Sequence, residues 1–145
     1  MKVVLQRVKQ ANVAVGGDIV GQINKGILLL IGAQKNDTEK QAAYLADRCS
    51  GLRIFEDAMG KMNLSLLDIG GQALVVSQFT LCGDLSGGRR PSFDNAMPPA
   101  EAEQLVAYFC KMLTEKGIEV QTGRFGAKMA VELINDGPVT FVLEN

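Results

Sequence analysis

The sequence contains no histidine among its 145 residues. Without histidine, neither a Ser-His-Asp triad nor a Cys-His pair can form, because both use an imidazole as the general base. The same absence removes the commonest metal ligand of proteins. If the chain is an enzyme, its chemistry comes from hydroxyls, lysines, carboxylates, main-chain groups or the substrate itself. We therefore expect no metal and no other cofactor.

Cysteines and long apolar runs are also scarce. The three cysteines, Cys49, Cys82 and Cys110, are odd in number and far apart, which favours reduced, buried thiols over a disulfide frame or a zinc site. The longest apolar run, residues 27–33, is far short of the ~20 residues that a membrane helix needs. Charges come too early in residues 1–10 for a secretory signal. We expect a cytoplasmic protein that does not enter a membrane.

The composition is that of an ordinary globular protein. Hydrophobic residues make up 47% of the chain and charged residues 21%, and the length suits a single domain over residues 1–145. A domain of this size buries roughly 70% of the surface that its unfolded chain exposes, so it can build a core. The net charge of −1 is not that of a general nucleic-acid binder, although a local basic patch can still hold phosphates.

Apolar periodicity predicts more strands than helices. The first helix has a capping signal at Thr38 or Asp37, with Gln41 three residues after Thr38 as in a capping box. The second begins at a Pro-Pro pair followed by acids. Strands that mostly run in groups indicate the α+β class, and we expect a curved, barrel-like, mostly antiparallel sheet with two main helices packed outside. The expected strands span 3–15, 19–23, 26–33, 52–57, 72–82, 118–123, 129–136 and 139–145, and the expected helices span 38–51 and 98–117.

The segment SQFTL, residues 77–81, ends a strongly apolar predicted strand just before the Gly-rich loop 83–99. Alternation along that strand places Gln78 and Thr80 on the face opposite to Phe79. Strand ends that feed loops are common places for chemistry. The hydroxyls fit either a reactive site or the simpler role of satisfying main-chain groups at the strand end.

The loop segment SGGRRPSF, residues 86–93, combines glycines with Arg89 and Arg90. Its main-chain amides and two guanidiniums suit a phosphate group. It lacks the Lys-Ser/Thr ending of a P-loop, which argues against a nucleotidase. A mobile surface loop is the alternative that the sequence leaves open.

The pair Gly137-Pro138 interrupts the most strand-like part of the C-terminal region. Proline cannot donate a ladder hydrogen bond, and glycine before it relaxes the usual steric limits on that residue. An X-Pro bond loses only about 0.5–1 kcal/mol on becoming cis. The pair can therefore aim two carbonyls rigidly into a cavity, or it can form a plain turn between two strands. Spacing alone does not separate these readings.

Several of these segments together resemble the D-aminoacyl-tRNA deacylase family. The resemblance spans essentially the whole chain. It implies a homodimer, with its active site at the interface, that binds tRNA and hydrolyses the ester joining a D-amino acid to it, a proofreading step in translation. The segments that carry the resemblance are VVLQRV (3–8), SQFTL (77–81), RRPSF (89–93) and GRFGAKMAVELINDGPVTF (123–141).

The resemblance also implies roles for individual residues. In that family the Gly-Pro peptide is cis and reaches across the dimer interface into the partner's pocket. Gly137 and Pro138 are thus expected to act as a chiral gate whose orientation Arg7 helps to hold. The residues expected to line the pocket for the aminoacyl group and the terminal adenosine are Ser77, Gln78, Phe79, Thr80 and Met129, and those expected to contact tRNA are Arg89 and Arg90.

Two mechanisms are compatible with these assignments. In one, Thr80 is a nucleophile that forms an acyl-enzyme, but no histidine activates it. In the other, main-chain amides near Phe79 and Thr80 stabilise the oxyanion while the ribose hydroxyl of tRNA helps to activate water, and we favour this one. A gate that rejects only L side chains cannot reject glycine, so we also expect activity on glycyl-tRNA.

Alternatives from other classes remain open. A non-catalytic tRNA-binding module predicts retention of tRNA without ester hydrolysis. A Thr80-nucleophile hydrolase of D-amino acid derivatives predicts no dependence on tRNA. A purely structural interaction protein predicts neither property.

Overall fold

Strand β1 (Lys2–Val15) is the central strand of the main sheet, because it pairs with β2, β3 and β8. The computed structural model describes residues 1–145 and contains a sheet in the order β2-β1-β3-β6-β7, with β8 also paired to β1. The remaining elements are β2 (Asp18–Ile23), β3 (Gly26–Gly32), α1 (Glu39–Gly51), β4 (Phe55–Glu56), β5 (Met62–Leu64), β6 (Gln72–Ser77), the 3-10 helix η1 (Phe79–Cys82), α2 (Pro99–Glu115), β7 (Glu119–Thr122) and β8 (Ala130–Glu144).

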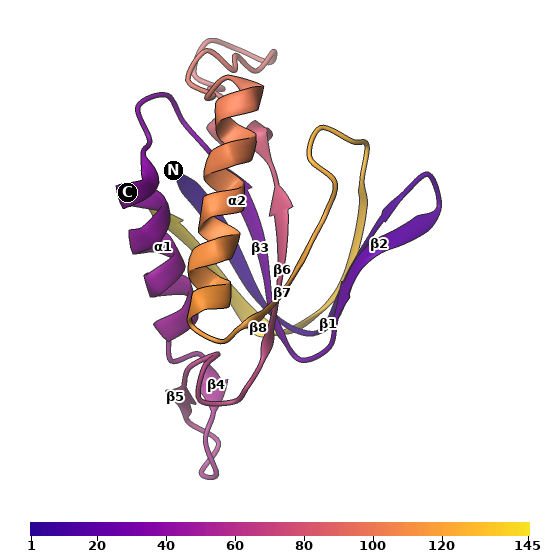
Figure 1. The fold of residues 1–145 in the computed structure, drawn as a ribbon, viewed down its shortest axis with the longest axis vertical. Coiled ribbons are helices and arrows are strands. Elements are labelled where there is room, and N and C mark those ends of the chain that lie inside the picture. The colour runs from indigo at the N-terminus through magenta and orange to yellow at the C-terminus, as the bar shows by residue number, and fades with distance from the viewer.

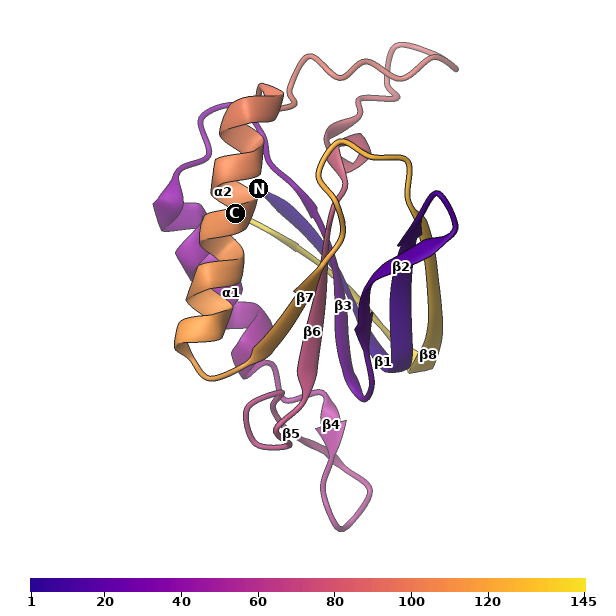
Figure 2. The same cartoon turned by 45° about the vertical axis from the view of Figure 1, so that its right-hand side comes forward.

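The sheet is mixed and strongly curved. β1 runs antiparallel to β2, β3 and β8, whereas β3–β6 and β6–β7 are parallel pairs. Parallel neighbours need a crossover connection, and α1 and α2 supply the two crossovers. Both helices cover the same face of the sheet, and the small β4–β5 sheet projects at one end (Figure 1, Figure 2). The predicted α+β class, with a barrel-like sheet and two outer helices, is confirmed.

Hydrophobic cores lie on both faces of the sheet. The larger core packs the helices against one face and includes Phe55 and Phe109, while a smaller core around Leu28 and Leu74 fills the concave face. Because β3 and β6 are covered on both faces, their sequences are nearly continuous apolar runs rather than alternating ones. No helix has both the length and the apolar character needed to span a bilayer.

The helix boundaries follow the local signals in the sequence. The Thr38 side chain accepts a hydrogen bond from the Lys40 amide at 3.3 Å, and Gln41 Oε1 accepts one from the Thr38 amide at 3.0 Å, so the predicted capping box is confirmed. α2 begins at Pro99, and Gly117 follows its end with a φ of 86°. This left-handed conformation favours glycine, which explains the residue found there.

The strand predicted over residues 72–82 is too long. β6 stops at Ser77, the chain turns at Gln78, and the next four residues form η1. The Gln78 amide still donates to the Ile31 carbonyl at 2.7 Å, but its own carbonyl accepts from the Leu81 amide at 3.1 Å and closes the turn. The expected alternation of side chains beyond Ser77 is therefore wrong.

The two strands predicted at 129–136 and 139–145 are one strand, β8. Its register with β1 pairs Val8 with Asn135 and then Gln6 with Thr140, so one residue of β1 faces four residues of β8. Gly137-Pro138 lies in this bulge rather than in a turn, because β1 is long enough to pair with both halves of β8.

The strand predicted at 52–57 is reduced to the two residues of β4. It pairs with β5, in a segment where no strand was predicted, and forms a separate two-stranded sheet. Local sequence gave no strong strand signal for β5, whose three residues depend on this pairing.

Strands β2 and β7, at opposite ends of the curved sheet, approach each other closely at Gly21. A Cβ atom on Gly21 would lie 2.5 Å from the carbonyl oxygen of Thr122 and 3.3 Å from Leu74 Cδ1. We expect Gly21→Ala to force the strands apart and to lower the free energy of unfolding by about 1–3 kcal/mol, as overpacking does. Urea denaturation measures this loss.

Gly51→Ala is the matched control. A Cβ at Gly51, the last residue of α1, meets nothing within 4 Å, so this variant should be neutral or slightly stabilising. Equal unfolding midpoints for the two variants would show that β2 and β7 are not in close contact.

Candidate functional site

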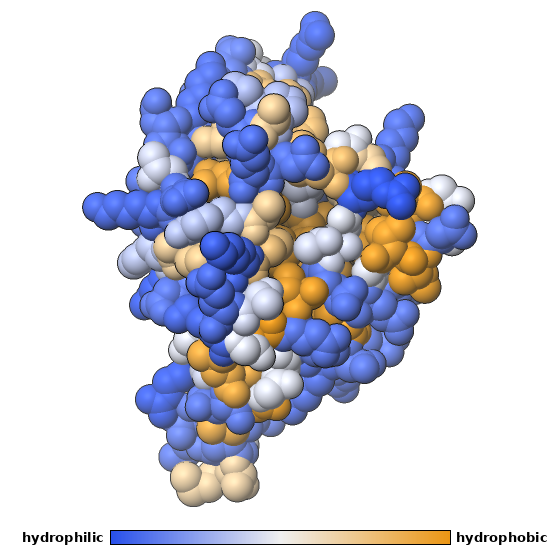
Figure 3. All heavy atoms as spheres, viewed as in Figure 1, coloured by the Kyte–Doolittle hydropathy of each residue, from blue (hydrophilic) through white to orange (hydrophobic).

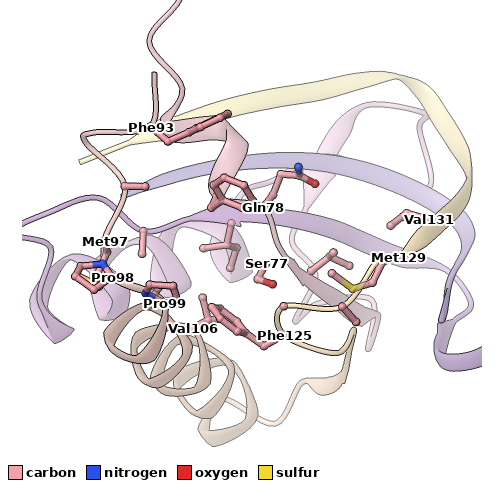
Figure 4. A pocket seen from close by; sticks show the side chains of 18 residues that line it. Ser77, Gln78, Phe93, Met97, Pro98, Pro99, Val106, Phe125, Met129 and Val131 are labelled. Atoms are coloured by element: carbon pink, nitrogen blue, oxygen red, sulfur yellow. The ribbon is translucent and has the colours of Figure 1, made fainter. Parts of the chain in front are cut away.

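A cavity of about 600 Å³ opens among the end of β6, the start of α2 and the segment that leads from β7 into β8 (Figure 4). Of its 18 lining residues, 13 are hydrophobic, which is the usual character of a site for a small organic group. In Figure 3 apolar atoms are visible between α2 and the part of the sheet near β2. Lining residues that matter for its chemistry are Ser77, Gln78, Phe79, Phe93, Phe125 and Met129.

The polar rim of the cavity comes from the end of β6. Ser77 lies opposite Ile31 of β3 in the parallel ladder, and its side chain is among those that surround the cavity in Figure 4. Gln78 follows it, and its side-chain Nε2 donates a hydrogen bond to Thr80 Oγ1. Thr80 is exposed and is not among the lining residues. A carboxamide cannot take up a proton, so its contact orients the Thr80 hydroxyl without activating it.

The reversal at Gln78 leaves main-chain donors at the same rim. Phe79 and Thr80 are the first residues of η1, where N–H groups have no acceptor within the helix. The amide of the next residue, Leu81, already donates a hydrogen bond to the Gln78 carbonyl. Adjacent free amides beside a mostly apolar cavity are suited to stabilising a negative charge that develops on an ester oxygen.

An aromatic pair stands at the mouth of the cavity. The rings of Phe79 and Phe93 meet edge to face, with centroids 5.0 Å apart and planes at 63°. Phe79 is 59% exposed, which leaves one ring face free for a flat ligand group. Phe93 belongs to the loop after η1, whose base is closed by hydrogen bonds of 2.8 and 3.0 Å between Asp84 and Ser92 main chains.

The basic residues of this loop are free for another partner. Arg89 and Arg90 are exposed, form no ion pair and lie outside the cavity lining. The nearest carboxylates in sequence are Asp94 and Asp84, and a hydrogen bond from the Ser86 amide lowers the pKa of Asp84. The two exposed guanidiniums are therefore available to a phosphate group.

Arg7 occupies a second, separate cluster at the bulge of β8. Its side chain is only 6% exposed. Its Nε donates to the Asp136 carbonyl at 2.7 Å, and its Nη1 donates to the Ile54 carbonyl at 2.5 Å. Carboxylate oxygens of Asp136 and Glu56 lie 3.4 and 4.0 Å from guanidinium nitrogens. The buried guanidinium thus ties the bulge to the segment between α1 and β4.

The bulge presents Gly137 and Pro138 to solvent. Both residues are exposed, and the peptide bond between them is cis. Neither they nor Arg7 line the cavity. Arg7 lies opposite Ile27, at the start of β3, whereas the cavity is at the other end of that strand.

Within one chain the residues predicted to line the pocket or to form the gate thus fall into two groups, and Arg89 and Arg90 belong to neither. One group comes together at the cavity and its rim: Ser77, Gln78, Phe79, Thr80 and Met129. The other lies at the bulge: Arg7, Gly137 and Pro138. In a single chain these two groups do not line one cavity.

The cysteines are not suited to nucleophilic chemistry. All three are free, and burial raises the pKa of Cys49 to about 12 and that of Cys110 to about 11. Burial also raises the pKa of Cys82, whose Sγ lies 3.3 Å from the Ala33 carbonyl. Thiols with raised pKa values stay protonated near neutral pH, so none is a ready thiolate. No group of three or more His, Cys, Asp or Glu side chains is placed to hold a metal ion.

Sequence reasoning missed several cavity residues. Phe93 and Phe125 lie within the segments RRPSF and GRFG, but no role was predicted for either. An aromatic residue flanked by glycine in a loop could have been flagged, since such a side chain has no strand neighbours to pack against. Met97 and Val106 gave no signal, because their neighbours in the cavity are distant in sequence.

Comparisons with known proteins identify relatives over the full length. The profile of the family described as D-Tyr-tRNA(Tyr) deacylase matches residues 4–144. The chain is 60% identical over 144 residues to a D-aminoacyl-tRNA deacylase of Geotalea uraniireducens (99% of this chain and 93% of the relative). It is 55% identical over 145 residues to one of Brevibacillus brevis (100% of both).

Solved structures give the same picture of the fold. A structure titled c-Myc DNA Unwinding Element Binding Protein superposes with a TM-score of 0.93 at 40% identity, covering 100% of this chain and 99% of that one. A probable eukaryotic D-amino acid tRNA deacylase superposes with a TM-score of 0.83, covering 98% and 97%. At 17% identity, the second likeness concerns the fold alone.

The contacts of Arg7 predict a large effect on stability. Arg7→Ala leaves the carbonyls of Ile54 and Asp136 without their donor at a buried position. We expect the free energy of unfolding to fall by about 2–4 kcal/mol, as measured by urea denaturation. Lys9→Ala, an exposed basic residue of the same strand, should change it by less than about 0.5 kcal/mol. Similar losses in both variants would contradict the role assigned to the guanidinium.

Proposed function

The chain belongs to the D-Tyr-tRNA(Tyr) deacylase family, and we propose that it hydrolyses the ester bond of D-aminoacyl-tRNA. Water adds to the ester carbonyl, the bond from that carbon to the ribose oxygen breaks, and free tRNA and D-amino acid leave. The observation that carries the proposal is the position of Ser77, Gln78 and Phe79 at an apolar cavity, in a chain aligned throughout with relatives of that name. The role is quality control of aminoacyl-tRNA, and because that substrate is used in the cytoplasm we expect the protein to act there.

The second part of the proposal is a homodimer with shared sites. β8 pairs with β1 on one side only, and such an edge strand is a template for another chain. It also exposes large apolar side chains, with Ile134, Phe141 and Val142 at 49%, 42% and 67% exposure. A second copy that covers β8 would bring the Gly137-Pro138 bulge of one protomer into the cavity of its partner. This arrangement unites the two groups of residues that lie apart in a single chain.

The cross-subunit bulge accounts for selection between enantiomers. Discrimination of about a thousandfold requires ~4 kcal/mol. A hydrophobic pocket usually provides only ~1–3 kcal/mol for a small difference in side-chain placement. Main-chain carbonyls held where an L side chain would project can exceed this by steric clash and by loss of solvation. Arg7 supports such a role, because its buried hydrogen bond to the Asp136 carbonyl fixes the bulge.

Catalysis is proposed to rest on positioning and oxyanion stabilisation. The amides of Phe79 and Thr80 face the developing negative charge, and the terminal ribose hydroxyl of tRNA helps to activate the attacking water. The Thr80 hydroxyl positions substrate rather than attacking it, because its side-chain partner, Gln78, is no base. Arg89 and Arg90 are proposed to contact tRNA phosphates, with an affinity that falls as salt rises.

Deacylation of paired substrates tests the proposed activity. We expect D-tyrosyl-tRNA to be hydrolysed with a kcat/KM about a thousandfold or more above that for L-tyrosyl-tRNA. Glycyl-tRNA should be hydrolysed as well, because glycine has no side chain for the gate to exclude. Binding of tRNA without hydrolysis would instead indicate a non-catalytic module, and sparing of glycyl-tRNA like the L substrate would refute selection by rejection.

Two changes separate the mechanisms. Thr80→Ala should keep kcat within about tenfold, the usual scale of one lost hydrogen bond. A D-tyrosyl-tRNA that ends in 2′-deoxyadenosine should react at least about a hundredfold more slowly, since it lacks the hydroxyl proposed to assist the water. Loss of all activity in Thr80→Ala, with a normal rate on the deoxy substrate, would instead make Thr80 the nucleophile.

A further inference from the structure

The β8 bulge lacks the regular ladder that normally holds a strand in place. Asp136 to Val139 stand opposite the single residue Arg7, between the Asn135 and Thr140 pairings. A bulge of this length needs other contacts if it is to present its tip in one position. The Arg7 side chain supplies one such contact, to Asp136, and the side chain of Asn135 supplies two more.

Asn135 closes the bulge at both of its ends. Its Nδ2 atom donates to the carbonyl of Arg7, across the strand pair, at 3.1 Å. The same Nδ2 donates to the carbonyl of Val139, beyond the bulge, also at 3.1 Å. One carboxamide therefore joins β1 to the two sides of the segment that carries Gly137 and Pro138.

The other end of the carboxamide packs against Gly137. A Cβ atom on Gly137 would overlap Asn135 Oδ1 and would lie 2.9 Å from the Val139 amide nitrogen. Glycine suits this position because the Asn135 side chain and the Val139 amide nitrogen both occupy the space that a Cβ atom needs. The carboxamide and the glycine thus fit each other directly.

We propose that Asn135 is a positioning residue that sets where the Gly137-Pro138 unit stands and thereby sets the preference for D over L substrates. The effect on substrate preference rests on the proposed function, whereas the effect on the shape of the bulge rests only on the contacts of Asn135. Arg7 anchors the bulge through Asp136, and Asn135 defines its shape through Arg7 and Val139.

The hydrogen bonds at this position favour asparagine over aspartate and alanine. Both contacts at Nδ2 need hydrogen-bond donors, and a carboxamide has two on that nitrogen. Aspartate has the same shape but would set a negative oxygen against two carbonyls. Alanine removes the bridge and leaves the space beside Gly137 open.

Kinetics of Asn135→Ala and Asn135→Asp test the proposal. A displaced bulge should admit L side chains, so kcat/KM for L-tyrosyl-tRNA should rise about tenfold or more while that for D-tyrosyl-tRNA falls less. Asn12→Ala is the matched control, because Asn12 Nδ2 donates at 3.1 Å to Glu132 on the same strand pair and has no contact with the bulge. It should leave both values unchanged.

A gain of activity on the L substrate separates positioning from stability alone, since general destabilisation lowers both activities. Unchanged or reduced hydrolysis of L-tyrosyl-tRNA in both Asn135 variants would overturn the proposal.

A double-mutant cycle in urea tests the contact without reference to catalysis. Gly137→Ala should lower the unfolding midpoint in the natural chain and lower it less in the Asn135→Ala background, where the overlapping atom is gone. Additive shifts would contradict a direct contact between Asn135 and Gly137. If the natural protein fails to hydrolyse D-tyrosyl-tRNA but the cycle shows coupling, the proposed function fails while the structural role of Asn135 stands.

Discussion

The buried guanidinium of Arg7 is the contact on which the proposed site depends. Burial of a charge is costly unless charged and polar partners surround it, and here two carbonyls and the Asp136 carboxylate do so. The contact joins three segments that are far apart in sequence: β1, the β8 bulge and the connection before β4. Ordering a main chain costs about 1–2 kcal/mol per residue, so a bulge of four residues holds one position only with such support. The Arg7 contacts therefore hold the β8 bulge, an irregular part of an edge strand, in one conformation.

The cavity depends on a different feature, the early end of β6. The parallel ladder with β3 carries Ser77 to the sheet edge, and the turn at Gln78 then places η1 across it. A side chain at Gly32 would come within 3.0 Å of the Gln78 carbonyl and of Cys82 Sγ, so glycine in β3 lets η1 pack closely. The two crossover helices put their apolar faces on the same side of the sheet, and α2 forms one wall of the cavity. Sheet topology therefore sets the polar rim, and helix packing sets the apolar wall.

Features encoded by neighbouring residues could be predicted from the sequence, whereas those that depend on distant partners could not. Thr38 and Gln41 are three residues apart and form their capping box wherever the helix lies. The end of β6 could not be predicted, because the turn and η1 that follow it pack against Gly32 of another strand. Local sequence around Gly137-Pro138 fits a turn equally well, and only the length of β1 makes β8 continuous. Ser77 ends β6, but Gln78, Phe79 and Thr80 lie beyond the strand that the sequence predicted for them. Phe93 and Phe125 reach the cavity from loops whose paths no local pattern describes.

The central claim is that a bulge held by Arg7 selects substrate in the cavity of the partner subunit, and mixed dimers test it most directly. One protomer carries Gly137→Ala, which displaces its bulge, and the other carries Ala127→Trp, which fills its cavity. In a mixed dimer the only open cavity would face the intact bulge of the filled protomer. We expect the Gly137→Ala protein alone to hydrolyse L-tyrosyl-tRNA, because its bulge is displaced. Adding excess Ala127→Trp protomer should suppress that hydrolysis, while hydrolysis of D-tyrosyl-tRNA continues. Hydrolysis of the L substrate that persists unchanged in the mixed dimers would contradict the account.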